Sequence, residues 1–409
     1  MKTKTLIVVG GGASGFFCAI NVAQFNPSLK IIIVEKTTKL LSKVKVSGGG
    51  RCNVTHACFE IEHLLKKYPR GNHFLKKLFY QFNTQDTVNW FEKRGVKLNA
   101  ESDGRMFPET NQSQTIINCL LHEAERLGVE IILNTEINEL EKQNNRFLLK
   151  TSKEELFHAD FVCIATGGYA QASKFKWLER LGHTIESPVP SLFTFNIPSS
   201  PMKELMGVSV EKASVKIKET KWKQEGPLLI THWGVSGPAV LKLSAFAARY
   251  LAEQNYHFQI SINWLAKEEQ KIKEECLQLR KQYSSSKMNQ KNPFNLPQRL
   301  WTFLLQSSSI DKDLRWADLT TKQLNLLIKN LYSQEFEVKG KTTFKEEFVT
   351  CGGIKLSEIE PSTMQSKLVE NLFFVGEILD IDGITGGFNF QNAWTSGFIA
   401  AKGISGKNK

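Results

Sequence analysis

The sequence predicts an α/β protein in which a Rossmann-type cofactor-binding domain, built on a parallel sheet, is split by an inserted β-barrel domain and a small helical domain. Three observations support this prediction. A glycine motif stands between a strand and a helix at the N-terminus, a second strand and glycine-rich turn lead into a helix near the C-terminus, and strand-like and helix-like segments lie between them. The predicted parts are 1–188 and 336–409 for the cofactor-binding domain and the returning barrel edge, 189–262 for the barrel, and 263–335 for the helices.

Length and composition narrow the class of protein. The chain has 409 residues, of which 41% are hydrophobic and 23% charged, so two or three globular units are expected and whole-chain disorder, collagen and coiled coil are excluded. It has no run of about 18 uncharged apolar residues, as a membrane span needs, and its N-terminal apolar stretch is too short for a signal peptide, so the cytoplasm is the expected location. Seven scattered cysteines predict neither a disulfide framework nor a metal site.

The first motif lies at the N-terminus. Residues 5–9 (TLIVV) form a continuous β-branched run, typical of a strand buried on both faces of a parallel sheet. The next residues, 10–15 (GGGASG), form a G-x-G-x-x-G motif. In such a motif Gly10 permits the tight turn, Gly12 lets the backbone approach a pyrophosphate, and Gly15 lets the following helix pack against the strand. We therefore expect a diphosphate at the N-terminus of that helix.

An acidic residue strengthens this interpretation. The predicted helix (16–25) is followed by a second apolar strand (31–34) that ends in Glu35. A carboxylate at this position accepts a hydrogen bond from a ribose 2′-hydroxyl and disfavours a 2′-phosphate. The motif therefore favours FAD or NAD over NADP, with a glycine-rich turn that binds no ligand as the alternative.

Further glycine-rich segments indicate that the cofactor is FAD and not NAD. Residues 47–53 (SGGGRCN) can lie against a planar ring or phosphates, with charge from Lys43 and Arg51, and residues 162–168 (VCIATGG) form another buried strand ending in Thr-Gly-Gly. Near the C-terminus, a strand at 372–376 leads through Glu377 and a glycine-rich turn to a predicted helix at 393–401. Two-domain flavoproteins hold FAD from its far side with such a segment.

The middle of the chain has the patterns of the inserted domains. A helix is predicted over Lys267–Tyr283, a second from Pro297 through Leu305, and a third around Leu324–Leu331. Short alternating segments indicate antiparallel barrel strands at Ser191–Ile197, Ala213–Glu219, Leu228–Thr231 and His257–Ile262.

Several longer motifs identify a family. Along the chain they are GGGRCN (48–53), ATGG (165–168), LLITHWGVSGPAVLKLS (228–244), TCGGI (350–354), PSTMQSK (361–367) and GEILDIDGITGGFNFQNAWTSG (376–397). From about residue 5 to residue 404 the chain resembles the BaiN/RdsA (YhiN-like) family of NAD(P)/FAD-dependent oxidoreductases. The resemblance implies an FAD-binding Rossmann domain with an inserted β-barrel and helical domain. It also implies one of two activities, reduction of a uridine in large-subunit ribosomal RNA to dihydrouridine or reductive steps on steroid-like bile-acid intermediates.

The motifs and the resemblance together assign the FAD contacts. This sequence departs from the family at Leu41-Ser42, where a Gly-Arg pair is usual, at His56, where Asn is usual, and at 169–177 (YAQASKFKW), a loop that could help bind substrate or nicotinamide. The residues expected to bind FAD are Gly10, Gly12, Ala13, Ser14, Gly15, Glu35, Lys36, Lys43, Ser47, Gly48, Gly49, Arg51, Cys52, Asn53, Ile137, Thr166, Gly167, Gly376, Glu377, Asp380, Asp382, Gly386, Gly387, Phe388, Asn389 and Gln391.

The implied chemistry is hydride transfer from reduced FAD to an activated C=C bond. For uridine the hydride goes to C6 and a proton to C5, so a proton donor is needed. Cys52 is the first candidate, because Arg51 beside it would lower the thiol pKa; the alternative is a small residue packed against the flavin. His232, just before a Gly-Val-Ser-Gly turn, is the second candidate, and a histidine bonded to the backbone of the turn is its alternative. No separate nicotinamide domain is predicted, so NAD(P)H is expected to visit the flavin directly as a transient donor.

The charge distribution suggests a polyanionic partner. The chain carries 53 Lys+Arg against 41 Asp+Glu, a formal net charge of +12, and residues 201–300 hold 16 basic and 9 acidic side chains, a difference of +7. A second basic stretch, Lys66–Lys97, is interleaved with aromatic residues. Such charge favours rRNA or a ribosome-assembly intermediate, and a lysine-rich solubilising surface is the alternative. Four tryptophans either stack on bases or are structural residues. They are Trp222, Trp264, Trp301 and Trp316.

The sequence is compatible with three functions. The first is an FAD-dependent rRNA reductase that forms dihydrouridine, the second a small-molecule enone reductase, and the third a non-catalytic flavin-binding protein.

Overall fold

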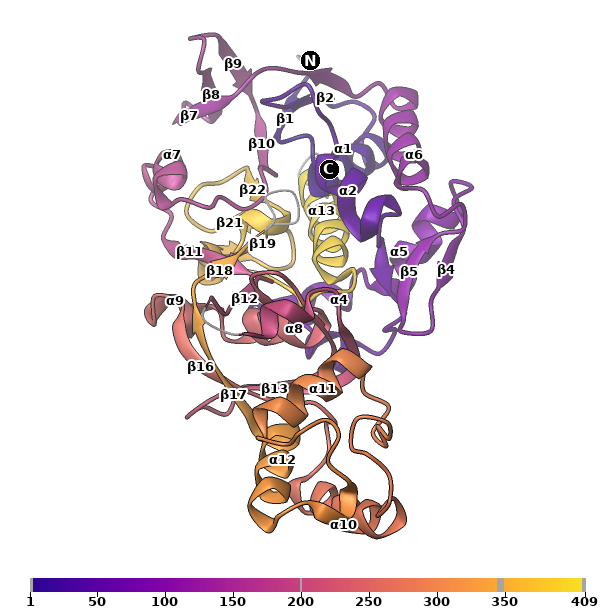
Figure 1. Ribbon diagram of the computed structural model, residues 1–409. Helices are drawn as coiled ribbons and strands as arrows, with labels where there is room; N and C mark the ends of the chain where they lie inside the picture. The colour runs from indigo at the N-terminus through magenta and orange to yellow at the C-terminus, as the bar shows by residue number, and fades with distance from the viewer. Residues whose placement is uncertain (1–2, 199–200, 344–348, 407–409) are drawn as a thin grey trace. The chain divides into compact units, whose positions relative to one another are not determined.

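The computed structural model describes residues 3–198, 201–343 and 349–406. These residues form two compact units, one from the described parts of 1–190 and 345–409 and the other from those of 191–344. Both ends of the chain therefore belong to the same unit, as the indigo and yellow ribbons of Figure 1 show.

The first unit combines a large sheet with smaller ones. Its strands are β1 (Thr5–Val9), β2 (Lys30–Val34), β3 (Thr55–His56), β4 (Leu98–Ala100), β5 (Arg105–Pro108), β6 (Glu130–Ile132), β7 (Ile137–Gln143), β8 (Arg146–Thr151), β9 (Leu156–Ala159), β10 (Phe161–Ile164), β11 (Ile185–Ser191), β19 (Val349–Ile354), β20 (Ile359–Glu360), β21 (Gln365–Ser366) and β22 (Leu372–Phe374). Its helices are α1 (Ala13–Phe25), α2 (Ser42–Gly50), α3 (Ile61–Leu65), α4 (Asn72–Phe79), α5 (Thr84–Glu92), α6 (Ser113–Arg126), α7 (Lys176–Glu179) and α13 (Phe388–Gly406).

The main sheet has the parallel core that the sequence predicts. Its strand order is β20-β21-β22-β10-β1-β2-β6, and the five strands from β22 to β6 are parallel. β1 lies between β10 and β2 and buries Leu6, Ile7 and Val8 completely. Its β-branched run therefore fills the interior on both faces, and the predicted Rossmann-type α/β fold is confirmed.

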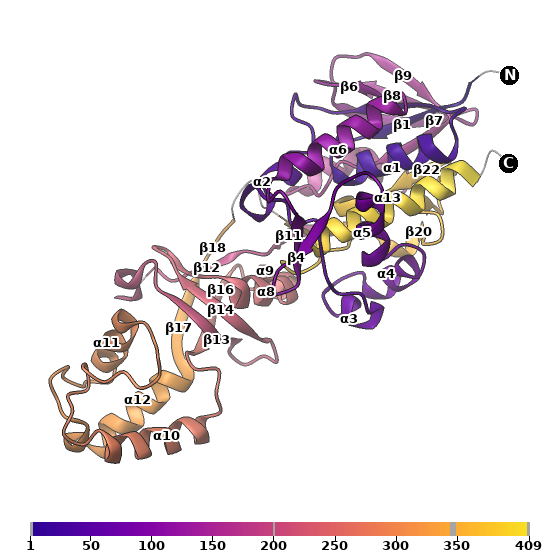
Figure 2. The same ribbon diagram turned by 90° about the vertical axis from the view of Figure 1, so that its right-hand side faces the viewer.

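Helices α1 and α13 come from opposite ends of the chain and lie side by side (Figures 1 and 2). A Cβ at Gly397 would lie 2.9 Å from the Ser14 carbonyl oxygen, so the helices approach closely because this position carries no side chain. Both helices are longer than predicted. α1 begins at Ala13, directly after the glycine turn, and α13 covers Phe388–Gly406, so both begin before the predicted starts at residues 16 and 393.

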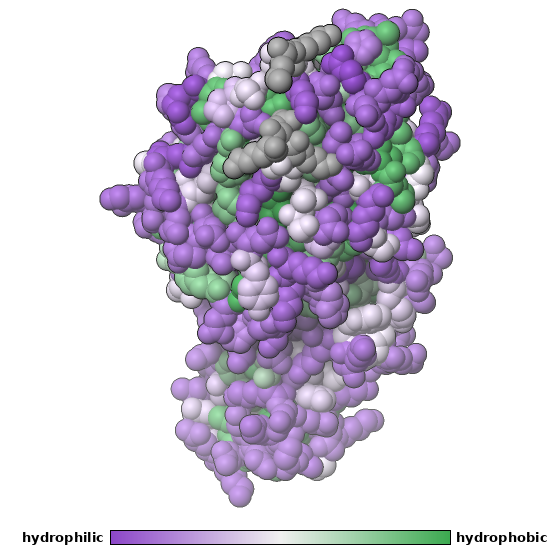
Figure 3. Space-filling model, turned by 180° about the vertical axis from the view of Figure 1, so that it is seen from behind, coloured by the Kyte–Doolittle hydropathy of each residue, from purple (hydrophilic) through white to green (hydrophobic). Residues whose placement is uncertain are grey.

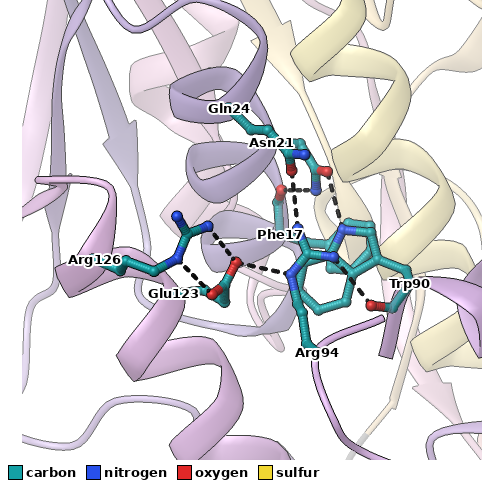
Figure 4. A network of polar contacts seen from close by, with 7 residues as sticks. All are labelled: Phe17, Asn21, Gln24, Trp90, Arg94, Glu123 and Arg126. Carbon is teal, nitrogen blue, oxygen red and sulfur yellow. Dashed lines mark hydrogen bonds and ion pairs between the residues drawn. The ribbon is translucent and has the colours of Figure 1, made fainter. Parts of the chain in front are cut away.

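A polar network fixes α1 to helices α5 and α6 (Figure 4). The Trp90 indole donates to the Asn21 side chain at 3.0 Å, and Arg94 Nε donates to the buried Glu123 carboxylate at 2.9 Å. Arg126 donates to the same carboxylate at 2.9 Å. Hydrogen bonds from Arg126 are the main cause of the lowered pKa of Glu123. The network holds the helix whose N-terminus faces the candidate site.

A partly exposed glutamate, a buried histidine and a buried serine form a hydrogen-bonded row that ties the β20–β21 hairpin to the segment before β11. His183 Nδ1 lies 3.2 Å from the Glu358 carboxylate and its Nε2 lies 3.1 Å from Ser366 Oγ. Ser366 Oγ also accepts hydrogen bonds from the N–H groups of Leu368 and Val369. Burial lowers the pKa of His183. Because the serine is buried and its oxygen is held by the backbone, the chain of residues is structural.

The second unit contains mostly antiparallel strands and helices. Its strands are β12 (Thr194–Asn196), β13 (Ser209–Ile217), β14 (Lys223–Ile230), β15 (Gly234–Ser236), β16 (His257–Asn263), β17 (Gln334–Lys339) and β18 (Lys341–Thr342). Its helices are α8 (Pro238–Phe246), α9 (Ala248–Glu253), α10 (Glu269–Gln282), α11 (Gln298–Ser307) and α12 (Thr321–Ser333).

The strands of this unit close into a barrel. The order is β17-β16-β13-β14-β15-β12-β18, with all pairs antiparallel. Only Gly340, with φ +92°, separates β17 from β18, so one bent strand pairs with β16 at its start and with β12 at its end. The ladder therefore returns through this bent strand to the strand with which it began.

The helices of this unit pack on the barrel through a shared core. Trp264, Trp301 and Trp316 are fully buried in one hydrophobic cluster with barrel residues such as Val215 and Ile260. These three tryptophans are structural, and base stacking by them is excluded. The division of the region into a barrel at 189–262 and a helical domain at 263–335 stays a prediction.

The face in Figure 3 is largely hydrophilic. Within the described ranges, no helix is both long enough and apolar enough to cross a membrane.

Candidate functional site

The glycine motif turns the chain from β1 into α1 and leaves room beside the helix N-terminus. A Cβ at Gly10, where φ is +117°, would lie 2.4 Å from the Ala165 carbonyl oxygen, and one at Gly15 would lie 2.1 Å from the Gly10 carbonyl oxygen. Gly12 differs, because no described atom lies within 4 Å of its Cβ position. No side chain caps α1, and its first turn, with Ala13 at its start, contains no acidic residue. The positive end of the helix dipole thus faces space that suits an anion.

Glu35 follows β2 and is fixed beside this turn. One carboxylate oxygen accepts a hydrogen bond from the Gly11 N–H at 2.9 Å and the other from the Thr37 N–H at 3.0 Å. The Thr37 hydroxyl also donates to the second of these oxygens at 3.0 Å, so the oxygen bonded to the Gly11 N–H is the one that can accept a further hydrogen bond, as a ribose hydroxyl would supply. Lys36, the next residue, is exposed.

The second glycine-rich loop begins inside α2. Gly48 has φ +60° and a Cβ there would lie 2.8 Å from the Phe107 ring, whereas at Gly49 no described atom lies within 4 Å. The Arg51 guanidinium lies 3.9 Å from the Phe107 ring centroid and donates to the Glu101 carboxylate at 2.6 Å. The structure therefore places the Arg51 charge in a contact that stabilises the loop.

Cys52 lies within this loop with φ +61° and is fully buried. Burial raises the pKa of its thiol from 9.0 to about 12, and a hydrogen bond with Ser47 opposes the increase by less. The expectation that Arg51 lowers this pKa is therefore wrong, because the loss of water around the thiol outweighs any nearby positive charge.

The C-terminal part of the chain meets the N-terminus of α1. A Cβ at Gly376 would lie 2.6 Å from the Ser14 hydroxyl oxygen. Glu377, the next residue, accepts hydrogen bonds from Lys43 Nζ at 2.6 Å and from the Thr350 N–H at 2.9 Å. Residues from both ends of the chain thus surround one helix N-terminus, as an FAD site closed by both ends requires.

The turn after Glu377 contains a buried ion pair. Asp382 is fully buried and pairs with Arg70, whose side chain is 11% exposed. The Asp380 N–H donates to the Ile354 carbonyl at 3.1 Å. The sequence predicts that Asp380 and Asp382 both contact FAD. In the structure the Asp382 carboxylate forms an ion pair with the Arg70 guanidinium instead.

The remaining residues of this turn hold the start of α13. Asn389 closes its own loop by accepting a hydrogen bond from the Gly383 N–H at 2.8 Å and donating to the Gly383 carbonyl at 2.9 Å. Gln391 is buried and accepts a hydrogen bond from the Thr55 hydroxyl at 2.6 Å. The Phe388 carbonyl accepts one from Tyr68 at 2.7 Å.

Glycines bring this turn against the second glycine-rich loop. A Cβ at Gly387 would lie 2.6 Å from the Thr55 carbonyl, and Gly386 has φ +126°. The Asn53 amide, in the orientation that satisfies its neighbours, donates to the Thr55 carbonyl at 2.9 Å and accepts from the Gly387 N–H at 3.0 Å. The Asn53 side chain and the Gly387 backbone therefore join the two loops.

Of three other predicted residues, two follow β10 and the third begins β7, which belongs to a separate three-stranded sheet. Thr166 follows β10, and at Gly167, where φ is +74°, no described atom lies within 4 Å of the Cβ position. Ile137 begins β7 and is buried.

His56 is a further candidate site residue, which the sequence analysis names only as a departure from the family pattern. Its ring stacks on Phe388 with centroids 4.8 Å apart and an interplanar angle of 21°. A Cβ at Gly104 would lie 2.3 Å from the same ring. The histidine thus sits between a tight turn and the start of α13. The sequence feature that could have indicated a role for His56 is its position three residues after the RCN motif (51–53).

His232 belongs to the second unit. It is exposed in the turn between β14 and β15, with its ring centroid 3.7 Å from that of Trp233. The turn is closed by hydrogen bonds between the backbones of Thr231 and Gly234.

The donor set of the first unit fits FAD. The open space at Gly12 lies at an uncapped helix N-terminus, which suits the diphosphate. Glu35 suits the ribose, and the open positions at Gly49 and Gly167 leave room for further parts of a large cofactor. Apart from the Glu35 carboxylate, these features come from the path of the main chain.

Comparisons with known proteins agree with this fit. A family model described as the HI0933-like protein Rossmann domain matches residues 4–403. The chain is 26% identical to a 3-dehydro-bile acid delta(4,6)-reductase from Clostridium scindens, with 97% of each chain covered. It is 29% identical to a ribosomal RNA dihydrouridine synthase from Escherichia coli, with 99% of this chain and 98% of that protein covered.

A solved structure extends the comparison to the fold. The open conformation of a flavocytochrome c3 fumarate reductase superposes with a TM-score of 0.51 and 16% identity, over 99% of this chain and 78% of that one. At this identity the likeness shows the fold alone.

Proposed function

The chain belongs to the HI0933-like Rossmann family, and from this premise we propose that it reduces a uridine of large-subunit rRNA to dihydrouridine, with FAD as cofactor and NAD(P)H as electron donor. The family that the sequence resembles is confirmed, and the fold is that of an FAD-dependent oxidoreductase. The closeness of Gly376 to Ser14 at the α1 N-terminus supports the FAD part of the proposal, because it brings residues from both ends of the chain to one helix N-terminus.

The chain's own residues bind and orient in this proposal. FAD, once reduced, supplies the hydride for C6 of the uracil ring. The α1 N-terminus at Gly12 holds the diphosphate and Glu35 holds the ribose. Lys43 and Glu377 join the two sides of the site through their 2.6 Å ion pair.

Two lines of support favour RNA as the substrate. The E. coli relative is named a ribosomal RNA dihydrouridine synthase and matches nearly the full length of this chain. The net charge of +12 suits a phosphate backbone. An RNA substrate would place the protein in the cytoplasm. A small-molecule enone reductase is the second candidate, because the relative from C. scindens is named a bile-acid reductase and matches almost as well.

The deciding experiment compares rRNA from cells with and without this chain. We expect mass spectrometry to find uridine in the deletion strain where dihydrouridine stands in the parent, and the wild-type gene to restore dihydrouridine. An unchanged dihydrouridine inventory would exclude the rRNA function. Loss of flavin absorbance when NADH or NADPH is added without oxygen tests the redox role, and a flavin that neither donor bleaches would favour the non-catalytic alternative.

The proton donor is tested with Cys52→Ala and His232→Ala. A general acid contributes about 10²–10⁴-fold to the rate. Because burial raises the pKa of Cys52 to about 12, it is a weak acid, and we expect the larger loss of product formation for His232→Ala. Flavin bleaching by NAD(P)H should be unchanged in both variants. A larger loss for Cys52→Ala would reverse the assignment.

A further inference from the structure

The second unit has a basic hollow of about 340 Å³ on the outer face of its barrel. Three lysines line it, Lys216, Lys218 and Lys223, together with one acidic residue, Glu219. The remaining lining is polar, with hydroxyl groups from Ser214, Ser261 and Tyr332 among it. All of these residues lie in the second unit, so the hollow shares no lining residue with the candidate flavin site of the first.

The strand pattern explains why these side chains meet. Along β13, Val215 and Ile217 are buried in the barrel core, and the residues that alternate with them face outward. Pairing places Lys216 directly opposite Lys223 on β14 and opposite Ser261 on β16. The hollow thus has a central cation with a second cation on one side and a hydroxyl group on the other.

The hollow has one acidic residue for three lysines, and two of the lysines pair with glutamates outside it. Like charges directly opposite each other across two strands are destabilising, and Lys216 forms no ion pair with any side chain in the described ranges. Lys218 pairs with Glu335 at 3.0 Å and Lys223 with Glu225 at 3.1 Å, but all four side chains are at least one-third exposed. Such pairs are worth little, so an incoming anion can readily displace them.

We propose that this hollow binds a backbone phosphate of an RNA chain. Lysine and hydroxyl side chains are common phosphate contacts in nucleic-acid complexes, and they fix position without reading sequence. An anion between Lys216 and Lys223 removes the repulsion that the fold otherwise retains. The choice of RNA as the source of the phosphate rests on the proposed function, whereas the phosphate chemistry rests on the lysine pair alone.

The test measures binding of a labelled single-stranded RNA of mixed sequence by fluorescence anisotropy, with the full FAD-loaded chain at several KCl concentrations. The variants are Lys216→Gln and Lys223→Gln. Lys212→Gln is the matched control, because Lys212 is an exposed lysine on the same strand that does not line the hollow.

For each hollow variant we expect about fivefold weaker binding in 0.1 M KCl and a salt slope smaller by about 0.7, which is one phosphate contact with a single strand. Lys212→Gln should bind as the wild type does. Thermal unfolding of Lys216→Gln should be unchanged or shifted upward, because the substitution removes a repulsion. Equal effects in all three variants, or an unchanged salt slope, would overturn the proposal.

Inorganic phosphate at matched ionic strength separates the sources of the ligand. If it binds in a Lys216-dependent manner while RNA does not bind, the hollow takes a free phosphate and the RNA assignment is wrong. These measurements need no turnover. An unchanged dihydrouridine inventory in the deletion strain would therefore refute the proposed function and leave the phosphate site to be judged by its salt slope.

Discussion

A valine in place of Gly12 is expected to weaken FAD binding about 10–100-fold while the apoprotein stays folded. The Gly12 backbone, with φ −93° and ψ −173°, suits any L-residue, and no described atom lies within 4 Å of its Cβ position. The added side chain therefore meets only the cofactor. Overpacking costs about 1–3 kcal/mol, which corresponds to the stated loss of affinity. Flavin absorbance per protein and a titration with FAD measure it.

Gly15→Ala is the matched control in the same motif. Its Cβ would lie 2.1 Å from the Gly10 carbonyl oxygen, so it should destabilise the apoprotein itself, seen as a lower unfolding temperature without FAD. If Gly12→Val bound FAD as the wild type does, the diphosphate would not lie at the α1 N-terminus, and the proposed site would be wrong.

Asp382→Asn is expected to lower the free energy of unfolding by about 3–5 kcal/mol, because it removes the carboxylate that pairs with the buried Arg70 guanidinium, on which Asp380 also acts. Asp382 is fully buried and the Arg70 side chain is 11% exposed, so water cannot replace the lost carboxylate. Urea unfolding of the apoprotein measures the change.

Glu130→Gln is the control for this prediction. The Lys30–Glu130 pair lies in the same unit with side chains about half exposed, so its loss should cost less than about 1 kcal/mol. If the Asp382→Asn protein were as stable as the wild type but no longer bound FAD, the ion-pair role would be wrong and Asp382 would contact FAD, as the sequence predicts.

The fold of the first unit was largely predictable because its signals are local. The β-branched run at 5–9 forms a strand buried on both faces, and the glycines after it occupy positions where Gly10 and Gly15 have no room for a side chain. The extent of α13 was not predictable from periodicity. Its mixture of small and apolar residues is buried on most sides, so no polar face marks where it begins.

The candidate site was predictable in its main-chain parts and less so in its side chains. The glycine turns and Glu35 lie where the motifs imply. The partners of Arg51 and Asp382 do not follow from the motifs, since Glu101 and Arg70 approach only after distant segments have packed. The predicted direction of the Cys52 pKa shift was wrong for the same reason, because the burial of the thiol depends on how the whole loop packs.

By itself the sequence determined the strand–glycine–helix unit, the acidic residue that follows it and the glycine-rich return at the C-terminus, because the φ of a turn or the room beside a helix is a property of a few adjacent residues. Only the tertiary structure decided that Gly376 rests on Ser14, that Lys43 pairs with Glu377 and that Lys216 faces Lys223 across two strands. The first two contacts form only when the two ends of the chain pack together, since Lys43 and Glu377 are 334 positions apart, and the third depends on the register in which β13 pairs with β14, which the residue pattern of a single strand does not fix.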